Sequence, residues 1–172
     1  MLAIVCPGQG SQTPGFLAPW LELDGTRDLL ASLSDAAGVD LIRHGTESDE
    51  ETIKDTAVAQ PLIVAAGLVA AAALEADAAA PKSTVVAGHS VGEVTAAAVT
   101  GVLSPAEALS LVRVRATVRN DATGREDLAP GLFVDEVTPF AVHEGEHEVP
   151  GAVEVDAVDT GLVLELLRGL LD

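Results

Sequence analysis

The chain has 172 residues, of which 48% are hydrophobic, a length and composition that suit one folded domain and exclude a wholly disordered chain. Acidic residues outnumber basic ones 27 to 9, and the formal net charge is −18. Such a chain repels a phosphate backbone, so nucleic acid is excluded as a partner. The single cysteine, Cys6, excludes an internal disulfide framework and fits a reducing, cytoplasmic compartment.

No segment has the pattern of a membrane anchor or a signal peptide. The most apolar stretch, Leu62–Leu74, has 13 residues, is shorter than a bilayer span and predicts a buried core helix. The N-terminal run Met1–Val5 is short, follows no basic segment and leads directly into Pro7-Gly8. We therefore expect a soluble protein that makes no membrane contact.

Charge and texture divide the chain into two parts. Residues 1–119 hold 14 acidic and 7 basic residues, a net charge of −7, whereas residues 120–172 hold 13 and 2, a net charge of −11. Ala-rich helical patterns give way to short alternations of Val, Glu and Asp, and Asn120–Gly124 is a turn-forming cluster. We predict a core domain at 1–119 and an acidic tail at 120–172.

Strands and helices alternate along the first part, which predicts an α/β fold in which helices cover a parallel sheet. In chain order the expected elements are a strand at Leu2–Cys6, a helix at Thr26–Ala37, a helix at Gln60–Ala79 with Pro61 in its first turn, a strand at Thr84–Ala87, a helix from Gly92 onward, and a helix that begins with the capping box Ser104-Pro105-Ala106-Glu107. In the tail we expect strands at Leu132–Val137 and Ala152–Val158 and a terminal helix with an apolar face over Leu162–Leu171.

The segment Gly88–Gly92 (GHSVG) matches the G-x-S-x-G pattern between a predicted strand and a predicted helix. A serine on such a sharp turn projects its hydroxyl out of the sheet, and the helix that follows directs free N–H groups toward it. Ser90 is therefore a candidate nucleophile. The alternative is that Ser90 only caps the helix, because Ser90 and Glu93 also fit a capping box. The side chain of His89 should point away from that of Ser90 and pack or orient the turn.

A glycine-rich loop, Gly8–Gln12 (GQGSQ), follows the first strand. It can offer backbone N–H groups to an anion, or it can be an ordinary turn between a strand and a helix. It is neither a Walker A sequence nor a G-x-G-x-x-G fingerprint, because no Gly-Lys pair follows and residue 13 is Thr.

Taken in order, GQGSQ, the segment Ala59–Leu62 (AQPL), GHSVGE and an arginine 25 residues after Ser90 resemble the malonyl-CoA:acyl carrier protein transacylases, the acyltransferases of fatty acid and polyketide synthesis. The resemblance covers residues 1 to about 115. It implies an α/β core with a serine nucleophile elbow, and malonyl-CoA and acyl carrier protein as partners. It implies no cofactor.

The resemblance also implies site residues. Ser90 matches the serine that carries the malonyl group as an ester. The backbone N–H groups of Gln9 and Val91 match the oxyanion hole, and Arg115 matches the arginine that binds the free carboxylate of malonate. Gln60 and His89 would belong to the pocket. Without the resemblance, Arg115 could equally form an internal salt bridge, and Arg113 is an alternative at almost the same place.

Other parts of the family pattern are absent from the sequence. The family has a ferredoxin-like subdomain after the arginine helix and then a G-A-F-H motif whose histidine activates the serine, so we expect a fold truncated relative to the family. The later histidines, His143 and His147, lie 53 and 57 residues after Ser90 in a different motif (HEGEH). Because Gly145 disfavours the helix that a metal-binding H-x-x-E-H motif needs, we expect a solvated acidic loop at Val142–Glu148 and no metal site.

The sequence thus predicts a serine acyltransferase that transfers malonyl groups, with an incomplete catalytic set. Two alternatives stay open. One is a serine thioesterase or hydrolase, in which water replaces the carrier thiol. The other is a non-catalytic fragment that binds acyl groups or a partner protein.

Overall fold

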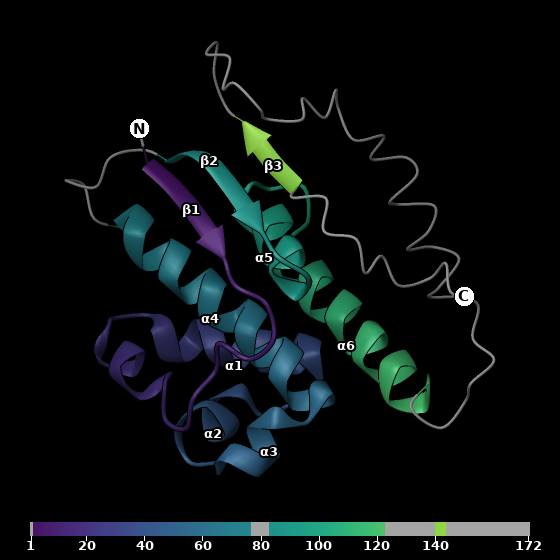
Figure 1. Ribbon diagram of the computed structural model, residues 1–172. Coiled ribbons are helices and arrows are strands. Elements are labelled where there is room, and N and C mark those ends of the chain that lie inside the picture. The colour runs from purple at the N-terminus through teal and green to yellow at the C-terminus, as the bar shows by residue number, and fades with distance from the viewer. Residues whose placement is uncertain (1, 77–82, 123–139, 144–172) are drawn as a thin grey trace.

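The computed structural model describes residues 2–76, 83–122 and 140–143. In this part of the chain, three strands form one sheet in the order β1–β2–β3 (Figure 1): β1 is Leu2–Cys6, β2 is Ser83–Gly88 and β3 is Phe140–His143. Strands β1 and β2 are parallel, with Cys6 paired to Gly88. The two predicted strands and their parallel arrangement are therefore confirmed.

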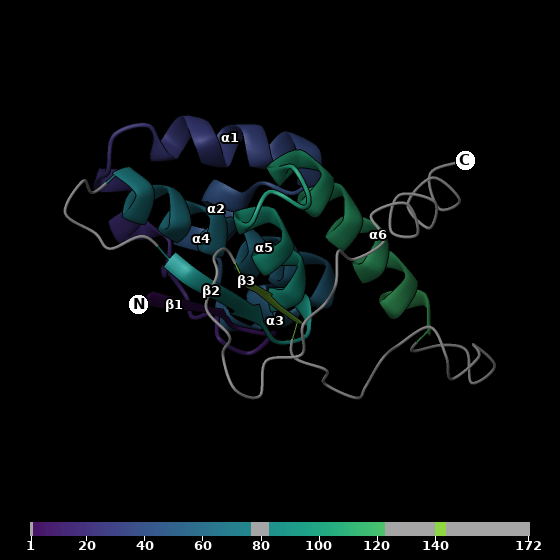
Figure 2. The same cartoon turned by 90° about the horizontal axis from the view of Figure 1, so that it is seen from above.

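The described helices are a 3₁₀ helix at Ala18–Glu22, α1 (Thr26–Ala37), α2 (Leu41–Thr46), α3 (Glu50–Lys54), α4 (Thr56–Ala76), α5 (Val91–Val99) and α6 (Pro105–Ala122). Helices α1, α4, α5 and α6 lie on one side of the sheet (Figure 2). Helix α5 packs against β1 and β2, α4 packs on α5 and α6, and α1 packs on α6 and α4. The predictions of α1, α5 and the start of α6 are confirmed.

Helix α4 differs from the prediction at its start. It begins at Thr56, so Pro61 lies inside the helix and not in its first turn. The Asp55 carboxylate accepts a hydrogen bond from Ala57 N at 2.8 Å, and Asp55 O accepts one from Ala59 N at 2.7 Å. Proline in a helix interior removes one backbone hydrogen bond. Burial of the segment Ala59–Ala65 in the core offsets that loss.

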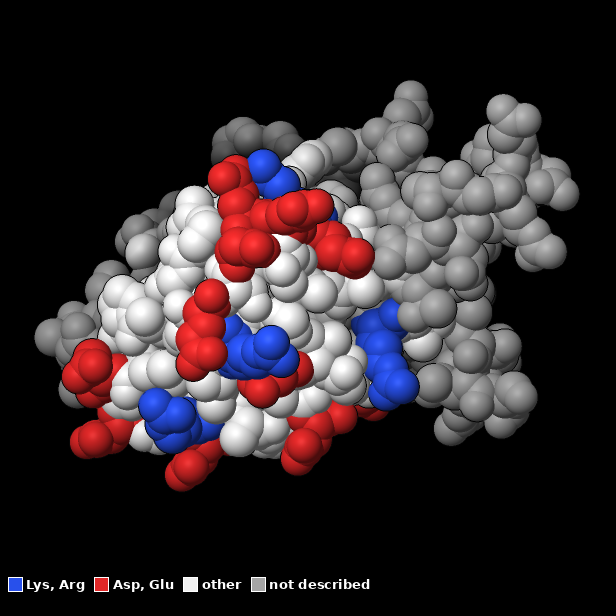
Figure 3. Space-filling view, turned by 90° about the horizontal axis from the view of Figure 1, so that it is seen from below, with Lys and Arg blue, Asp and Glu red and all other residues white. Residues whose placement is uncertain are grey.

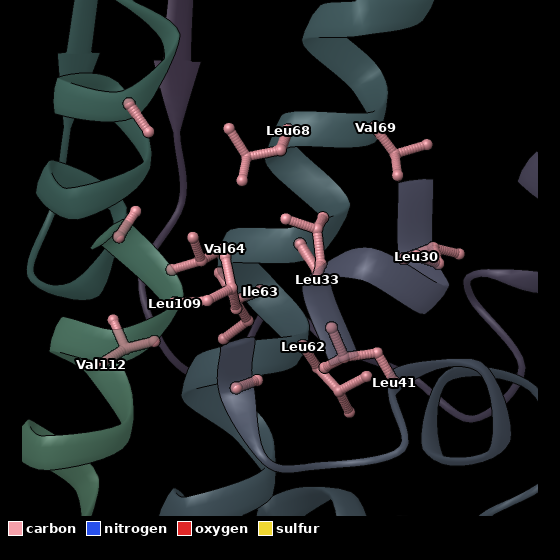
Figure 4. Packing of buried hydrophobic residues seen from close by; sticks show 14 of the residues in the cluster. Leu30, Leu33, Leu41, Leu62, Ile63, Val64, Leu68, Val69, Leu109 and Val112 are labelled. Atoms are coloured by element: carbon pink, nitrogen blue, oxygen red, sulfur yellow. The ribbon is translucent and has the colours of Figure 1, made fainter. Parts of the chain in front are cut away.

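The hydrophobic core forms where α1, α4 and α6 meet (Figure 4). Leu30, Leu62, Val64, Leu109 and Val112 are completely buried there. Each such side chain contributes about 1.5–3 kcal/mol to the free energy of unfolding. By length and composition α4 could also cross a membrane, a criterion that core helices of soluble proteins meet as well. Here the central part of α4 is buried among the other helices, as predicted for a core helix.

The acidic tail supplies one strand to the sheet. β3 pairs antiparallel with β2, and Phe140 lies opposite Gly88. The expected acidic loop at Val142–Glu148 is therefore wrong for its first two residues, which pair with the edge of β2 that β1 leaves open and so satisfy its backbone N–H and C=O groups. Helix α6 continues through the proposed boundary to Ala122. The strands predicted at 132–137 and 152–158 and the terminal helix lie outside the described residues.

The acidic excess is visible on the described surface. Figure 3 shows Asp and Glu side chains spread over one face of the molecule, with Lys and Arg in smaller separate groups. One ion pair between neighbouring turns, Lys54 Nζ to Glu50 Oε1 at 2.7 Å, lies exposed on α3. An exposed pair of this kind contributes little to stability. Around α2 and α3 the fold is stabilised instead by buried Leu41 and Ile53 and by the helix caps Asp40 and Asp49.

Candidate active site

Two loops meet beyond the carboxyl ends of β1 and β2, where open α/β sheets bind their ligands. The loop Gly8–Gln12 follows β1, and the turn at His89 and Ser90 follows β2. The backbone N–H of His89 donates to Cys6 O at 3.1 Å and joins the two strand ends. A Cβ atom built on Gly8 would lie 3.6 Å from Ser90 Cβ, so the glycine-rich loop adjoins the serine.

Ser90 adopts a strained backbone conformation, with φ 56° and ψ −119°. Non-glycine residues rarely take positive φ, and such strain clusters at functional sites. Ser90 is the residue before the first turn of α5, yet its side chain makes no capping hydrogen bond. The alternative that Ser90 serves as a helix cap is therefore wrong. Its hydroxyl is left available for another partner.

The glycines around Ser90 allow the strands and α5 to approach closely. A Cβ atom on Gly88 would overlap the backbone of Gly92 and Glu93, and one on Gly92 would overlap Cys6 O and crowd Pro7 O. The ring of His89 packs against Gly8, with 3.0 Å between its Cδ2 and the position of a Gly8 Cβ. The G-x-S-x-G spacing thus reflects steric need at both glycines.

Arg115 provides the partner of the Ser90 hydroxyl. It lies half-buried on α6, and its Nη2 donates to Ser90 Oγ at 3.3 Å. Arg113 is exposed and directs its guanidinium to Gly38 at the C-terminal end of α1, with 3.1 Å between Cζ and the position of a Gly38 Cβ. Of the two arginines considered from the sequence, Arg115 is therefore the one at Ser90.

The first turn of α5 offers an amide to the site. The backbone N–H groups of Gly92 and Glu93 donate to His89 O at 2.9 Å and Ser90 O at 3.0 Å. Within the described part of the chain, the N–H of Val91 has no such acceptor. Val91 itself is buried. This amide stands at the positive end of the helix dipole, next to the serine.

Gln9 contacts the first residue of α4, and Gln60 lies within that helix. Gln60 is only 1% exposed, and its Nε2 donates to Gln9 Oε1 at 3.5 Å. Gln9 Nε2 in turn donates to Thr56 Oγ1 at 3.4 Å and to Lys54 O at 3.5 Å. The side chain of Gln9 is thus bound to the end of α3 and the start of α4, and its backbone N–H has no acceptor among the described residues. Gln60 lies behind this loop as a buried support.

Two other groups near the site are accounted for. Burial raises the pKa of the Cys6 thiol, which keeps Cys6 protonated and disfavours it as a nucleophile. His143 lies opposite Val85 in the β2–β3 register, three positions from Phe140, the partner of Gly88. That displacement is about 10 Å along the strand. His147 lies outside the described residues.

Gln12, the last residue of the GQGSQ loop, has a structural role that the sequence did not indicate. Gln12 accepts a hydrogen bond from Gly10 N at 2.8 Å and donates one to Ile53 O at 3.0 Å. Its only sequence signal was its place in the glycine-rich loop. Among the described residues, no cluster of three or more His, Cys, Asp or Glu side chains is arranged to hold a metal ion.

Comparison with known proteins identifies the fold. The family model of the acyl transferase domain matches residues 3–156. A malonyl CoA-acyl carrier protein transacylase of Mycobacterium tuberculosis (strain H37Rv) is 49% identical over 116 residues, 67% of this chain and 38% of that protein. The protein of that name from Haemophilus influenzae is 32% identical over 160 residues, 90% of this chain and 51% of that protein. The chain therefore spans about half, or less, of the length of these relatives.

Solved structures agree. The crystal structure of MCAT from Mycobacterium tuberculosis superposes with a TM-score of 0.68 at 47% identity, over 72% of this chain and 41% of that chain. A type II PKS acyl-carrier protein in complex with its malonyl-transacylase gives 0.65 at 31% identity, over 70% of this chain and 39% of that chain. The family resemblance found in the sequence is confirmed, and the chain belongs to the acyl transferase domain family.

Proposed function

We propose that the chain transfers a malonyl group from malonyl-CoA to the phosphopantetheine thiol of an acyl carrier protein, through an ester on Ser90. The transacylase relatives support this reaction. The observation that carries it is the Ser90 hydroxyl, which does not cap α5 and lies 3.3 Å from Arg115 Nη2. In this proposal β2, the strained turn and α5 form a nucleophile elbow.

In the first half-reaction, Ser90 Oγ attacks the thioester carbonyl of malonyl-CoA. The bond between Oγ and the acyl carbon forms, the C–S bond breaks, and coenzyme A leaves as a thiol with the proton of the serine. The N–H groups of Gln9 and Val91 stabilise the negative oxygen of the tetrahedral intermediate. One such donor typically contributes about 3–4 kcal/mol to lowering the barrier.

In the second half-reaction, the thiol of the carrier's phosphopantetheine attacks the same carbonyl. The new C–S bond forms, the ester bond to Oγ breaks, and the proton of the thiol returns to Ser90. The chain thus ends unchanged, and each half-reaction exchanges one acyl bond for another.

Arg115 would select the malonyl group. In the structure its guanidinium donates to a neutral hydroxyl. A carboxylate is a stronger acceptor and pairs with two guanidinium N–H groups at once. Malonate would therefore replace Ser90 as the acceptor of Arg115. This exchange would place the acyl carbon beside Oγ and release the hydroxyl for attack.

Mass spectrometry of the intact 172-residue chain after incubation with malonyl-CoA tests the proposal. We expect a mass increase of one malonyl group on Ser90, which disappears in Ser90→Ala and decreases on addition of phosphopantetheinylated carrier protein as the carrier gains it. A malonyl adduct that is lost to water at the same rate with and without carrier would instead indicate the hydrolase alternative. A folded chain that gains no adduct and no fluorophosphonate label would contradict both enzymes.

A further inference from the structure

Two glutamine side chains bind the loop Gly8–Gln12 to the end of α3. Gln12 Nε2 donates to Ile53 O at 3.0 Å, and Gln9 Nε2 donates to Lys54 O at 3.5 Å. These carbonyls belong to the last two residues of α3. The last carbonyls of a helix receive no hydrogen bond from an N–H group of the same helix. The helix end therefore needs donors, and the loop supplies them.

The same loop is also bound from within, by two further hydrogen bonds. Ser11 Oγ donates to Gly8 O at 3.0 Å, and Gly10 N donates to Gln12 Oε1 at 2.8 Å. Gly10 has φ +108°, a backbone conformation in which a residue with a side chain would be strained. Gln12 is half-buried, and its bond to Ile53 O is partly shielded from water.

These two bonds act on the two peptide planes on either side of the Gln9 Cα atom. Gly8 C=O and Gln9 N–H share one planar trans peptide and point in opposite directions. When Ser11 holds the carbonyl, it also sets the direction of the Gln9 N–H. Gln9 C=O and Gly10 N–H share the next plane, which Gln12 holds. Rotation of the first plane would turn the Gln9 N–H away from its present direction. The bond to Gln12 fixes the second plane and thereby holds the loop on the other side of the Gln9 Cα atom.

The Gln9 N–H is available for a ligand. In the described part of the chain it has no acceptor, whereas the neighbouring N–H of Gly10 is bound to Gln12. The loop also adjoins the serine, because a Cβ on Gly8 would lie 3.6 Å from Ser90 Cβ. Gln12 thus occupies one amide of the loop and leaves the other one open.

We propose that Ser11 and Gln12 are positioning residues, which hold the Gln9 N–H toward the acyl oxygen of a group on Ser90. This inference rests on the proposed function, because it needs an acyl carbonyl at Ser90. The two side chains touch no substrate. They act through the backbone of Gln9, so their loss should slow the chemical step and leave binding of the acyl-CoA unchanged.

The test is single-turnover acylation of the 172-residue chain by malonyl-CoA and by acetyl-CoA. In Ser11→Ala and in Gln12→Ala we expect the saturating rate to fall about 10- to 100-fold, part of what loss of an oxyanion donor costs. The half-saturating concentration should stay constant. Both substrates should slow by the same factor, because the acyl oxygen is common to them. Ser11→Thr, which keeps a hydroxyl, should restore the rate, and Thr13→Ala is the matched loop control.

Unchanged saturating rates in both alanine variants would overturn the inference, as would a selective loss of malonyl transfer or a Ser11→Thr variant as slow as Ser11→Ala. Phosphonylation of Ser90 by a fluorophosphonate provides a readout independent of malonyl-CoA, because its phosphoryl oxygen requires the same N–H. A parent chain that is phosphonylated but not malonylated contradicts the proposed function alone. In that case slower phosphonylation of the two variants supports positioning, and equal rates overturn it. A folded parent chain that resists both reagents overturns both.

Discussion

Arg115 Nη2 donates a hydrogen bond to Ser90 Oγ at 3.3 Å, although the two residues are 25 positions apart. Ser90 stands at the start of α5 and Arg115 in the second half of α6. The turn between these helices therefore brings a cation to the serine hydroxyl. The arginine is bound to the group that we propose as the nucleophile.

Substitution Arg115→Ala should change acyl selectivity. A hydrogen bond to a charged group contributes about 1.5–3 kcal/mol, which corresponds to a roughly 10- to 100-fold loss of malonyl transfer. Acetyl transfer has no carboxylate to bind and should stay constant or increase. The measurement is the ratio of acylation rates of Ser90 by malonyl-CoA and acetyl-CoA.

Arg113→Ala is the matched control for this experiment, because Arg113 lies on the same helix and is directed toward Gly38. It should keep the parental ratio. If Arg115→Ala also keeps that ratio, Arg115 does not bind the malonyl carboxylate.

Substitution Ser90→Gly should stabilise the fold while it abolishes acylation. The φ of 56° at Ser90 costs of order 1–3 kcal/mol for a residue with a side chain, and glycine avoids this cost. Glycine also makes the unfolded chain more flexible, which costs about 0.4–1 kcal/mol. We expect a net gain of about 1 kcal/mol in the free energy of unfolding, measured by denaturant titration. Ser90→Ala keeps the strain and should show no such gain, so equal stability of the two variants would argue against strain at this turn.

The pH dependence of acylation should show no imidazole base. The sequence holds no G-A-F-H motif, and the β2–β3 register places His143 opposite Val85, away from the serine end of β2. We expect malonylation of the 172-residue chain to be slow and to increase steadily with pH, because hydroxide or solvent must assist. His143→Ala and His147→Ala should leave the profile unchanged. A rapid reaction with an apparent pKa near about 6.5 that either substitution removes would show that a tail histidine acts as the base.

Acid should weaken the anchor of the helix that carries Arg115. Ser104 N and Oγ both donate to Glu107 Oε2, at 2.8 Å and 2.6 Å, and these hydrogen bonds lower the pKa of Glu107. A carboxyl group whose pKa is lower in the folded state stabilises the fold above its unfolded pKa. That contribution is lost as the pH falls through the folded value.

Glu107→Gln should therefore flatten the decrease of stability in acid, as measured by denaturation midpoints at acidic and neutral pH. Ser104→Ala removes the hydroxyl donor but keeps the backbone N–H, so it should flatten the decrease only in part. The double variant should add little to Glu107→Gln alone, because both changes act on one interaction. Additive effects would show that Glu107 senses pH through another contact.

The sequence patterns predicted the regular elements of the core well where local signals agreed with burial. Leu2–Cys6 and Thr26–Ala37 have the predicted bounds, and the Ser104 capping box forms as expected. The start of α4 was predicted too late, because a proline such as Pro61 indicates the first turn of a helix. In the structure Asp55 caps a helix that begins at Thr56, and burial of Ala59–Ala65 stabilises the turns around Pro61. β3 was missed because its pairing with β2 is set by tertiary contact, which a four-residue segment does not reveal.

The site was predictable in part. The pattern around Ser90 indicated a turn between a strand and a helix, but it could not decide between a cap and a free hydroxyl. That choice depends on φ and ψ at one residue. Spacing alone also could not tell Arg115 from Arg113, two positions apart on one helix, because the faces of α6 are defined by α1 and α4. The roles of Ser11 and Gln12 depend on backbone planes, which no side-chain pattern encodes.

The pairing of Cys6 with Gly88 has a consequence for how the gene can vary. Each of these residues immediately precedes a loop of the site, so the alignment of two strands sets the offset between the glycine-rich loop and the serine. A one-residue deletion in β1 would displace its loop by about 3.3 Å and turn every side chain of the strand to the opposite face. We therefore expect natural variants of this chain to tolerate insertions and deletions at the exposed turns around Gly25 and Gly101. Insertions and deletions within β1 or β2 should be selected against.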